Sequence, residues 1–168
     1  MKRWGILAAG LLVLTAVAPS QAADSALSPQ ANAAFVAANG KKPGVVTETS
    51  GLQHRSIHTG FGKRPKATDI VTVNYKGTLI NGKVFDATEP GMPAQFVVNK
   101  LIPGWTEALQ LMREGDEWEI VIPSNLAYGT RGAGDGAIPP DQTLVFDLTL
   151  VSVTPPPPEP KKDDDQSQ

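Results

Sequence analysis

A single tight turn constrains the fold of this chain more than any other feature. Asn81 and Gly82 both tolerate a positive φ, and this dipeptide between two strand-like runs is the strongest short-range signal for a β-hairpin. The turn therefore predicts that residues 83–87 fold back, antiparallel, onto residues 70–80.

The first strand of this hairpin has an alternating pattern. Val71, Val73 and Tyr75 share one face, and the residues between them are polar, as a half-buried strand requires. Tyr75 is therefore expected to point towards the core. The returning strand brings Phe85 and Asp86 close to Tyr75.

Other segments repeat the strand pattern. Apolar residues alternate with polar ones around Trp118 and again from Leu144 to Leu150, which predicts two strands laid over a shared core. Shorter strand-like runs occupy residues 45–49 and 52–57. The ordered part of the chain should therefore be largely β.

Between residues 103 and 112 the apolar spacing changes to i, i+3, i+4, i+7, which is typical of a helix. Pro103 suits its first turn, and Gly115 follows its end. The pattern predicts one short helix whose buried stripe is Trp105, Ala108, Leu109 and Met112.

Residues 124–142 form a long glycine-rich segment between the last two strands. A loop of this length inside a compact domain is usually functional or mobile. Its glycines do not follow a strand and open a helix, as a phosphate-binding loop would. We therefore interpret the segment as a flap.

Length and composition limit the classes of function. At 168 residues the chain has room for one domain plus tails, and its 15 prolines and 16 glycines indicate many turns. The formal net charge is −2, and no basic block with interleaved aromatics is present, which argues against a nucleic-acid partner. The sequence contains no cysteine, which excludes disulfides and thiolate metal sites.

The two histidines, His54 and His58, lie four residues apart on the same face of a predicted strand. This pair could hold a metal ion, but no third ligand is nearby. We therefore expect two surface residues, no metal site and no cofactor.

The start of the chain, residues 1–22, has the pattern of a secretory signal peptide. Lys2 and Arg3 precede an apolar run that is shorter than the roughly 20 residues of a spanning helix, and small residues follow at Ser20 and Ala22. Cleavage after Ala22 or Ala23 leaves 15 − 2 = 13 basic and 17 acidic residues, a net charge of −4. We expect an exported protein without membrane association, in the periplasm of a Gram-negative bacterium.

The other predicted boundaries follow composition. Residues 23–43 contain one short helix at 29–39, with Ser28 as its cap and Gly40 after its end. The domain itself spans residues 44–154. Residues 155–168 are rich in proline and charge, which predicts a disordered tail.

The domain carries a set of apolar and aromatic side chains with one acid and no obvious nucleophile. This composition indicates a dry pocket rather than a reactive centre. Its members are Tyr75, Phe85, Asp86, Phe96, Leu101, Ile102, Trp105, Tyr128, Ile138 and Phe146.

Five phrases carry these residues in a fixed order: VNYKGTL, GKVFD, LIPGW, NLAYG and IPPDQTLVFDL. In this order and spacing the chain resembles the FKBP-type peptidyl-prolyl cis-trans isomerases. The segment FVAANGKKPGVVTETSGLQ is similar to their exported bacterial branch, the macrophage infectivity potentiator type. The resemblance implies an α+β fold, in which a strongly curved antiparallel sheet of five to six strands wraps around one short helix.

The resemblance also implies roles for the pocket. The substrate proline would sit over the indole of Trp105, Tyr128 would donate its hydroxyl to a substrate carbonyl, and the Ile102 backbone amide would hold a neighbouring one. Asp86 would face the rotating carbonyl carbon and order Tyr75. One wall would comprise Tyr75, Phe85, Asp86 and Phe96, the base Leu101 and Ile102, and the opposing wall Tyr128, Ile138 and Phe146.

Rotation about an Xaa-Pro bond breaks no bond, which is consistent with a pocket that lacks a nucleophile. The function implied is isomerisation of proline-containing polypeptides, with macrolide-type inhibitors as ligands of the same pocket. The alternative is a chaperone or host-interaction module that binds apolar segments there with little turnover. Potentiator relatives dimerise through a long N-terminal helix, and because only about a dozen residues precede Gly40 as a helix, we expect a monomer.

Overall fold

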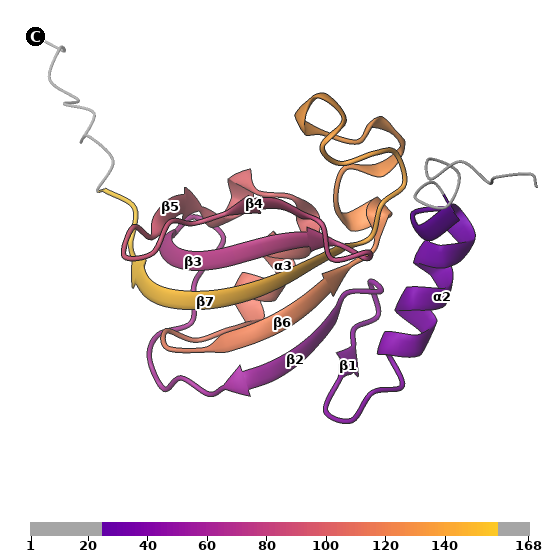
Figure 1. Cartoon of the computed structure of the whole chain (residues 1–168). Helices are drawn as coiled ribbons and strands as arrows, with labels where there is room; N and C mark the ends of the chain where they lie inside the picture. The colour runs from indigo at the N-terminus through magenta and orange to yellow at the C-terminus, as the bar shows by residue number, and fades with distance from the viewer. Residues whose placement is uncertain (1–24, 158–168) are drawn as a thin grey trace, which may run out of the picture.

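The computed structural model describes residues 25–157. One antiparallel sheet has the strand order β1-β2-β6-β7-β3-β4, and β5 pairs with the first half of β3 (Figure 1). The helices that accompany it are α2 (Pro29–Asn39) and α3 (Pro103–Leu111). The strands are β1 (Val46–Thr47), β2 (Gln53–His58), β3 (Ile70–Leu79), β4 (Val84–Ala87), β5 (Ala94–Val97), β6 (Glu117–Ile122) and β7 (Leu144–Thr154).

The predicted α+β class is confirmed, and the sheet has seven strands rather than five to six. The additional strand is β5, which lies outside the predicted strands because Pro90, Gly91 and Pro93 precede it. The turn residues do not predict a strand, and β5 is a strand because it pairs with β3.

The predicted hairpin is present, with a longer turn. The Leu79 amide donates to the Lys83 carbonyl at 2.9 Å, and the Lys83 amide donates to Asn81 Oδ1 at 3.0 Å. Of the two turn residues only Gly82 has a positive φ, of 83°. The Asn81 side chain therefore stabilises the turn by a hydrogen bond, and its backbone does not enter the left-handed region.

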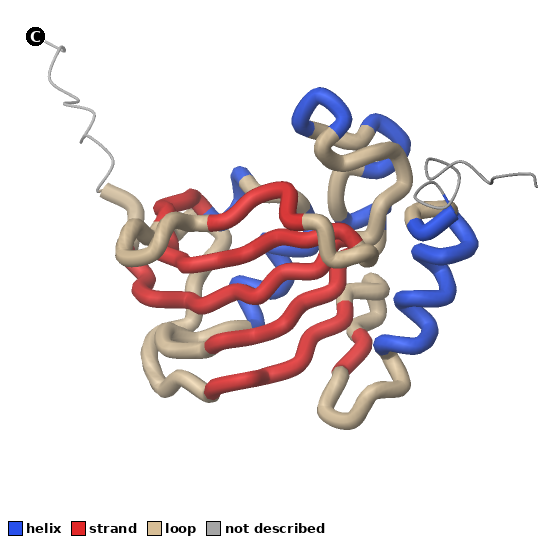
Figure 2. The backbone as a smooth tube through the Cα atoms, in the orientation of Figure 1, coloured by secondary structure: helices blue, strands red, loops and turns tan. Residues whose placement is uncertain are grey.

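β3 and β7 form the centre of the sheet. Their register runs from Ile70 opposite Thr154 to Leu79 opposite Leu144, with one bulge after Thr72. α3 lies across one face of the sheet (Figure 2). Alternate side chains of β3 and β7 are buried in the core together with Leu109 of α3. The period of two on the strands and of 3.6 on α3 thus builds one core between them.

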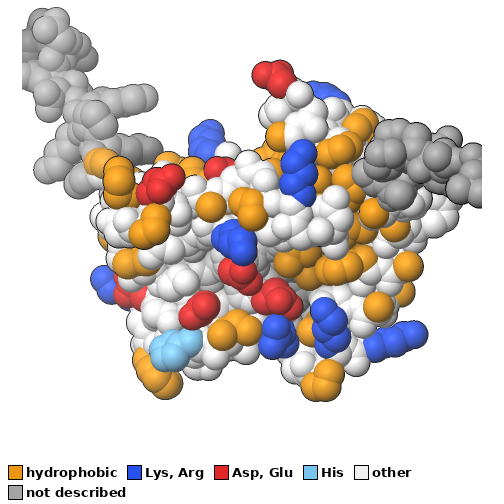
Figure 3. All heavy atoms as spheres, viewed as in Figure 1, with side chains coloured by type: hydrophobic (Ala, Val, Ile, Leu, Met, Phe, Trp, Pro, Cys, Tyr) orange, Lys and Arg blue, Asp and Glu red, His pale blue; other side chains and the backbone are white. Residues whose placement is uncertain are grey.

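The opposite face of the sheet is polar. Arg55, Glu119, Asp147 and Lys76 lie side by side on β2, β6, β7 and β3 and form a charged row (Figure 3). Arg55 and Glu119 form an ion pair at 3.3 Å. An antiparallel sheet with one solvated face is expected to divide its side chains in this way.

α2 begins and ends where the sequence predicts. The Ser28 hydroxyl accepts a hydrogen bond from the Ala31 amide at 3.2 Å. The helix lies at the end of the sheet from which the long loop of residues 124–142 projects (Figure 1). That loop contains three short 3-10 turns, η2 (Ser124–Leu126), η3 (Gly129–Arg131) and η4 (Gly134–Gly136).

The terminal predictions fall largely outside this structure. The predicted signal peptide, residues 1–22, lies outside the described residues, as do residues 158–168 of the predicted tail. Residues 155–157 are exposed and belong to no helix or strand.

Candidate active site

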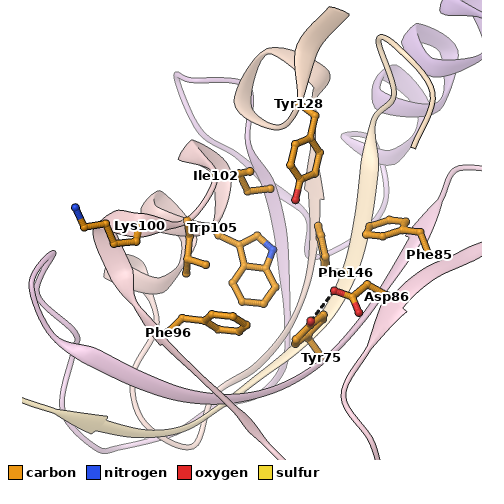
Figure 4. Close-up of a pocket in the computed structure, with 10 residues that line it drawn as sticks. Tyr75, Phe85, Asp86, Phe96, Lys100, Ile102, Trp105, Tyr128 and Phe146 are labelled. Carbon is orange, nitrogen blue, oxygen red and sulfur yellow. Dashed lines mark hydrogen bonds between the residues drawn. The ribbon is translucent and has the colours of Figure 1, made fainter. Parts of the chain in front are cut away.

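A cavity of about 310 Å³ opens between the start of α3, the neighbouring strands and the loop after β6. β3, β4, β5 and β7 contribute one side, η1 (Val98–Lys100) and α3 the base, and the loop with Tyr128 the other side (Figure 4). The lining residues are Tyr75, Phe85, Asp86, Phe96, Lys100, Leu101, Ile102, Trp105, Tyr128 and Phe146.

Trp105 forms the floor of this cavity. α3 starts at Pro103, which places the indole in its first turn, and the residue is only 4% exposed. The rings of Tyr75, Phe96 and Phe146 stand nearly perpendicular to it, with centroids at 5.2, 6.0 and 5.2 Å. Edge-to-face contacts of this kind are favoured by the ring quadrupoles, so the floor is apolar and well ordered.

A glycine makes room for two of the aromatic walls. Gly77 on β3 lies opposite Asp86 on β4 and Phe146 on β7. A Cβ at this position would stand 2.6 Å from the Phe85 ring and 2.8 Å from the Phe146 ring. The absence of a side chain lets these rings meet edge to face, with centroids 5.6 Å apart.

Asp86 is the acid of the cavity. Its Oδ2 accepts a hydrogen bond from the Tyr75 hydroxyl at 2.7 Å (Figure 4). Burial first, and then this hydrogen bond and the charge of Asp86, raise the pKa of Tyr75 well above its ordinary value. No lysine, arginine or histidine of the described residues forms an ion pair with Asp86, so its charge acts on the cavity without a cationic partner.

Tyr128 approaches the cavity from the loop, with its hydroxyl directed towards Trp105 and Asp86 (Figure 4). The residue is 40% exposed. Burial, followed by the charge of Asp86, raises the pKa of Tyr128. The hydroxyl therefore keeps its proton at neutral pH and can donate a hydrogen bond inside the cavity.

Comparison with known protein families identifies the chain. The family model described as FKBP-type peptidyl-prolyl cis-trans isomerase matches residues 62–151, more than half of the sequence. The chain belongs to the FKBP family. The resemblance drawn from the five phrases is confirmed.

Several relatives of this FKBP domain are known. It is 54% identical to the outer membrane protein MIP of Legionella longbeachae over 71% of this chain and 52% of the relative. It is 48% identical to a probable FKBP-type isomerase, FkpA, of Neisseria meningitidis over 78% of this chain and 48% of the relative. The chain thus spans about half the length of these relatives.

Solved structures agree with the fold. A peptidyl-prolyl cis-trans isomerase of Pseudomonas syringae has a TM-score of 0.70 and 40% identity, covering 83% of this chain and 98% of that one. FkpA of Escherichia coli has a TM-score of 0.74 and 42% identity, covering 82% of this chain and 63% of that one. The sheet wrapped across one short helix is therefore the FKBP fold.

The structure brings together nearly all the residues predicted for the FKBP pocket. Ile138 is the exception: it is 6% exposed and packs in the core, and its amide and carbonyl pair with Ala133 across the loop. Ile138 is not among the residues that line this cavity. Lys100 lines the cavity although sequence reasoning missed it, because an exposed lysine before Leu101 carries no distinguishing pattern.

The histidines differ from expectation. His58 is exposed, as predicted, but His54 is half-buried and stacks on Trp118 at a centroid distance of 4.3 Å. His54 Nε2 also lies 2.9 Å from Glu48 Oε1. His54 is therefore a packed residue of the sheet, because its ring covers the indole.

Residues 25–157 contain no group of three or more metal-ligating side chains. No helix in this part of the chain is long and apolar enough to cross a membrane.

Proposed function

We propose that this protein catalyses cis-trans isomerisation of Xaa-Pro peptide bonds in proline-containing polypeptides. The observation that carries the proposal is the cavity itself: an indole floor enclosed by three perpendicular aromatic rings, with one acid held by Tyr75 and the hydroxyl of Tyr128 at its walls. Membership of the FKBP family supports the same reaction.

The chemistry needs no covalent step. Rotation about an Xaa-Pro bond faces a barrier of roughly 20 kcal/mol and takes tens of seconds or longer without a catalyst. The planar amide places negative charge on oxygen and positive charge on nitrogen, and water stabilises this separation better than an apolar cavity does. A proline seated over Trp105 would therefore be moved towards the twisted, less conjugated state.

The polar groups would distinguish the twisted bond from the planar ones. Tyr128 would donate a hydrogen bond to a substrate carbonyl, and the Ile102 backbone amide would hold a neighbouring one. Asp86, fixed by Tyr75, would face the carbonyl carbon as it rotates. Interactions made only with the twisted form lower the barrier, at about 1.4 kcal/mol for each factor of ten in rate.

The test is the cis-to-trans rate of an Xaa-Pro peptide measured by NMR exchange, which needs no coupling protease. We expect the wild type to accelerate the exchange and Asp86→Ala with Tyr128→Phe to lose most of the acceleration. Asp147→Ala is the matched control, because Asp147 is an exposed acid on the opposite face of the sheet. A wild type that does not accelerate exchange, or a control as impaired as the pocket variants, would refute the proposal.

Macrolide-type inhibitors should compete for the same cavity. Its apolar floor and the donors at its rim suit a large, mostly apolar ligand with a few carbonyl oxygens. Inhibition of the exchange by a macrolide, lost in Trp105→Ala, would support this. Unchanged exchange at saturating macrolide would contradict it.

We further propose that the protein acts after export to the periplasm as a monomer. The signal pattern of residues 1–22 supports export, and a relative named as an outer membrane protein is consistent with it. α2 directs its buried side chains at its own domain, which supports the monomer. N-terminal sequencing of the exported chain should begin near Ala23, and sedimentation at twice the mature mass would overturn the monomer.

A further inference from the structure

The buried side chains of α2 are amides, and its larger apolar side chains, Phe35 and Val36, are only half-buried. Its buried residues are Asn32 and Asn39, which are 5% and 3% exposed and two helical turns apart. Each pairs with a buried glutamine of the domain: Asn32 Nδ2 donates to Gln142 Oε1 at 3.2 Å, and Asn39 Nδ2 donates to Gln53 Oε1 at 2.9 Å. We call these two pairs clamps: the first is Asn32 with Gln142, near the start of α2, and the second is Asn39 with Gln53, at its end.

The first clamp forms hydrogen bonds with the end of the long loop. Asn32 Oδ1 accepts a hydrogen bond from the Thr143 amide at 2.8 Å. Gln142 Nε2 donates to the Leu27 carbonyl at 3.1 Å and to the Pro140 carbonyl at 2.9 Å. The side chain of Gln142 thus joins the start of α2 to residue 140 of the loop.

The same segment holds the part of the loop that carries Tyr128. Asp141 adopts a left-handed conformation, with φ of 59°, between the clamped residues Pro140 and Gln142. In this conformation its amide donates to the Gly129 carbonyl at 2.9 Å. Gly129 is the neighbour of Tyr128, so hydrogen bonds and the short backbone segments between them connect α2 to the residue next to the tyrosine.

The second clamp has no such connection. Gln53 lies on β2, and its Nε2 donates back to the Val36 carbonyl of α2 at 3.0 Å. β2 pairs with β1 and β6 and contributes no residue to the cavity. Asn39 and Gln53 therefore stabilise the position of α2 without contacting the loop.

We propose that Asn32 and Gln142 are positioning residues for Tyr128, and that α2 acts through them to hold the loop over the cavity. This inference rests on the proposed isomerase function in assigning Tyr128 a role in the reaction. Tyr128 is 40% exposed, so its own packing restrains it weakly, and the loop around it is rich in glycine. Moving the end of the loop away from α2 would leave a buried amide of the pair Asn32 and Gln142 without its partner, which costs free energy. The pair therefore restrains the loop.

The experiment compares two matched substitutions, Asn32→Ala and Asn39→Ala, at a temperature where both variants are folded. Both remove one buried amide from the same helix. The Asn32 side chain bonds to Leu27, Ser28, Gln142 and Thr143, whereas that of Asn39 bonds to Gln53. The larger loss of stability is therefore expected for Asn32→Ala, and the comparison of activity is made on folded protein. Asn32→Ala should lower kcat/KM for an Xaa-Pro peptide by about fivefold, as expected for coupling between residues of one hydrogen-bond network, and Asn39→Ala by less than about twofold. Equal effects of the two substitutions would overturn the proposal.

A double-mutant cycle with Tyr128→Phe tests the route of the effect. If Asn32 acts through the tyrosine hydroxyl, Asn32→Ala should change kcat/KM by less than about twofold in the Tyr128→Phe background. Independent, multiplicative effects would show that the clamp does not position Tyr128. If Asn32→Ala does not fold, Gln142→Ala removes the other half of the pair and should give the same result.

Hydrogen exchange gives a readout that does not depend on activity. The Asp141 amide, bonded to Gly129, should exchange about fivefold faster in Asn32→Ala than in Asn39→Ala. If the Asp141 amide exchanges faster in Asn32→Ala but the wild type does not accelerate isomerisation, the clamp is supported and the proposed function is refuted. Unchanged exchange in an active protein would refute the clamp alone.

Discussion

The two sides of the cavity are built in different ways. Tyr75, Phe85 and Phe146 stand on strands whose backbones are fixed by the hydrogen bonds of the sheet, and their rings contact other aromatic rings. Tyr128 stands on a loop, contacts no other aromatic ring within the described residues, and is 40% exposed.

This difference separates two requirements of the proposed reaction. An apolar platform must be preformed, because water left on it would oppose the twisted amide, and strands with a shared core provide that rigidity. A hydrogen-bond donor must reach a substrate that enters and leaves, and a loop allows this at the expense of local stability. Residues of the strand side should therefore dominate stability, while Tyr128 should matter mainly for activity.

The largest expected effect is a loss of stability on the strand side of the cavity, the side formed by Tyr75, Phe85 and Phe146. Phe146→Ala removes a ring that is 4% exposed and should lower the free energy of unfolding by about 3–5 kcal/mol. Tyr128→Ala removes a side chain that is 40% exposed and should cost less than about 1 kcal/mol. Urea unfolding of both variants measures the difference, and equal losses would contradict the division of roles.

A smaller loss is expected from Gly77→Ala. The added methyl group would meet the rings of Phe85 and Phe146, and overpacking of this kind costs roughly 1–3 kcal/mol. The rate of isomerisation should fall too, since both rings line the cavity. The control is the double variant Gly77→Ala with Phe85→Leu, in which the smaller side chain gives room; a double variant less stable than Gly77→Ala would argue against a steric cause.

Much of the strand side could be predicted from the sequence. The period of two in β3 and the Asn81–Gly82 turn place Tyr75 near Phe85 and Asp86, because strand geometry converts spacing directly into position. The helical period likewise locates Trp105 in the first turn of α3. The family phrases added the identity of the pocket to an arrangement that periodicity already indicated.

The loop side could not be predicted in the same way. Its path depends on contacts between residues far apart in sequence, such as Asn32 with Gln142, and no periodic pattern reports them. The phrase IPPDQTLVFDL assigns Ile138 to the pocket wall, whereas in the structure its backbone pairs with Ala133 and its side chain is buried in the core outside the cavity lining. The clamp of α2 was missed for the same reason, since the helix looks marginal when only its apolar residues are considered.

The two sides can also be compared by titration, because Tyr75 and Tyr128 are the two tyrosines of the chain. Burial and Asp86 raise the pKa of both above the ordinary value of about 10. The folded protein therefore holds these protons more tightly than the unfolded chain. The stability linked to them is complete below about pH 10 and is lost as the pH rises further, towards the folded pKa values.

The near-ultraviolet absorbance of tyrosinate measures the ionisation of the two tyrosines directly. Little tyrosinate should form in the folded protein at pH 10, and the remaining signal should belong to one residue in Tyr75→Phe and in Tyr128→Phe. Asp86→Asn should lower the midpoints of both tyrosines, while burial, the largest cause, keeps them above the ordinary value. Asp147→Asn is the control, and an equal shift in that variant would show that total charge, and not Asp86, is responsible.

The smallest expected effect concerns the rim of the cavity at Lys100. Its side chain lines the cavity, but its ammonium group is directed away from the aromatic floor (Figure 4). An exposed charge in water contributes at most about 1 kcal/mol to an interaction and is screened by salt. Lys100→Ala should therefore change kcat/KM by less than about twofold for a neutral Xaa-Pro peptide, and by up to about fivefold for a peptide with an acidic residue beside the proline. The effect on the acidic peptide should disappear at high salt. A large loss of kcat/KM with the neutral peptide would contradict the assignment of Lys100 to the solvent-exposed rim and show that it acts with the aromatic wall.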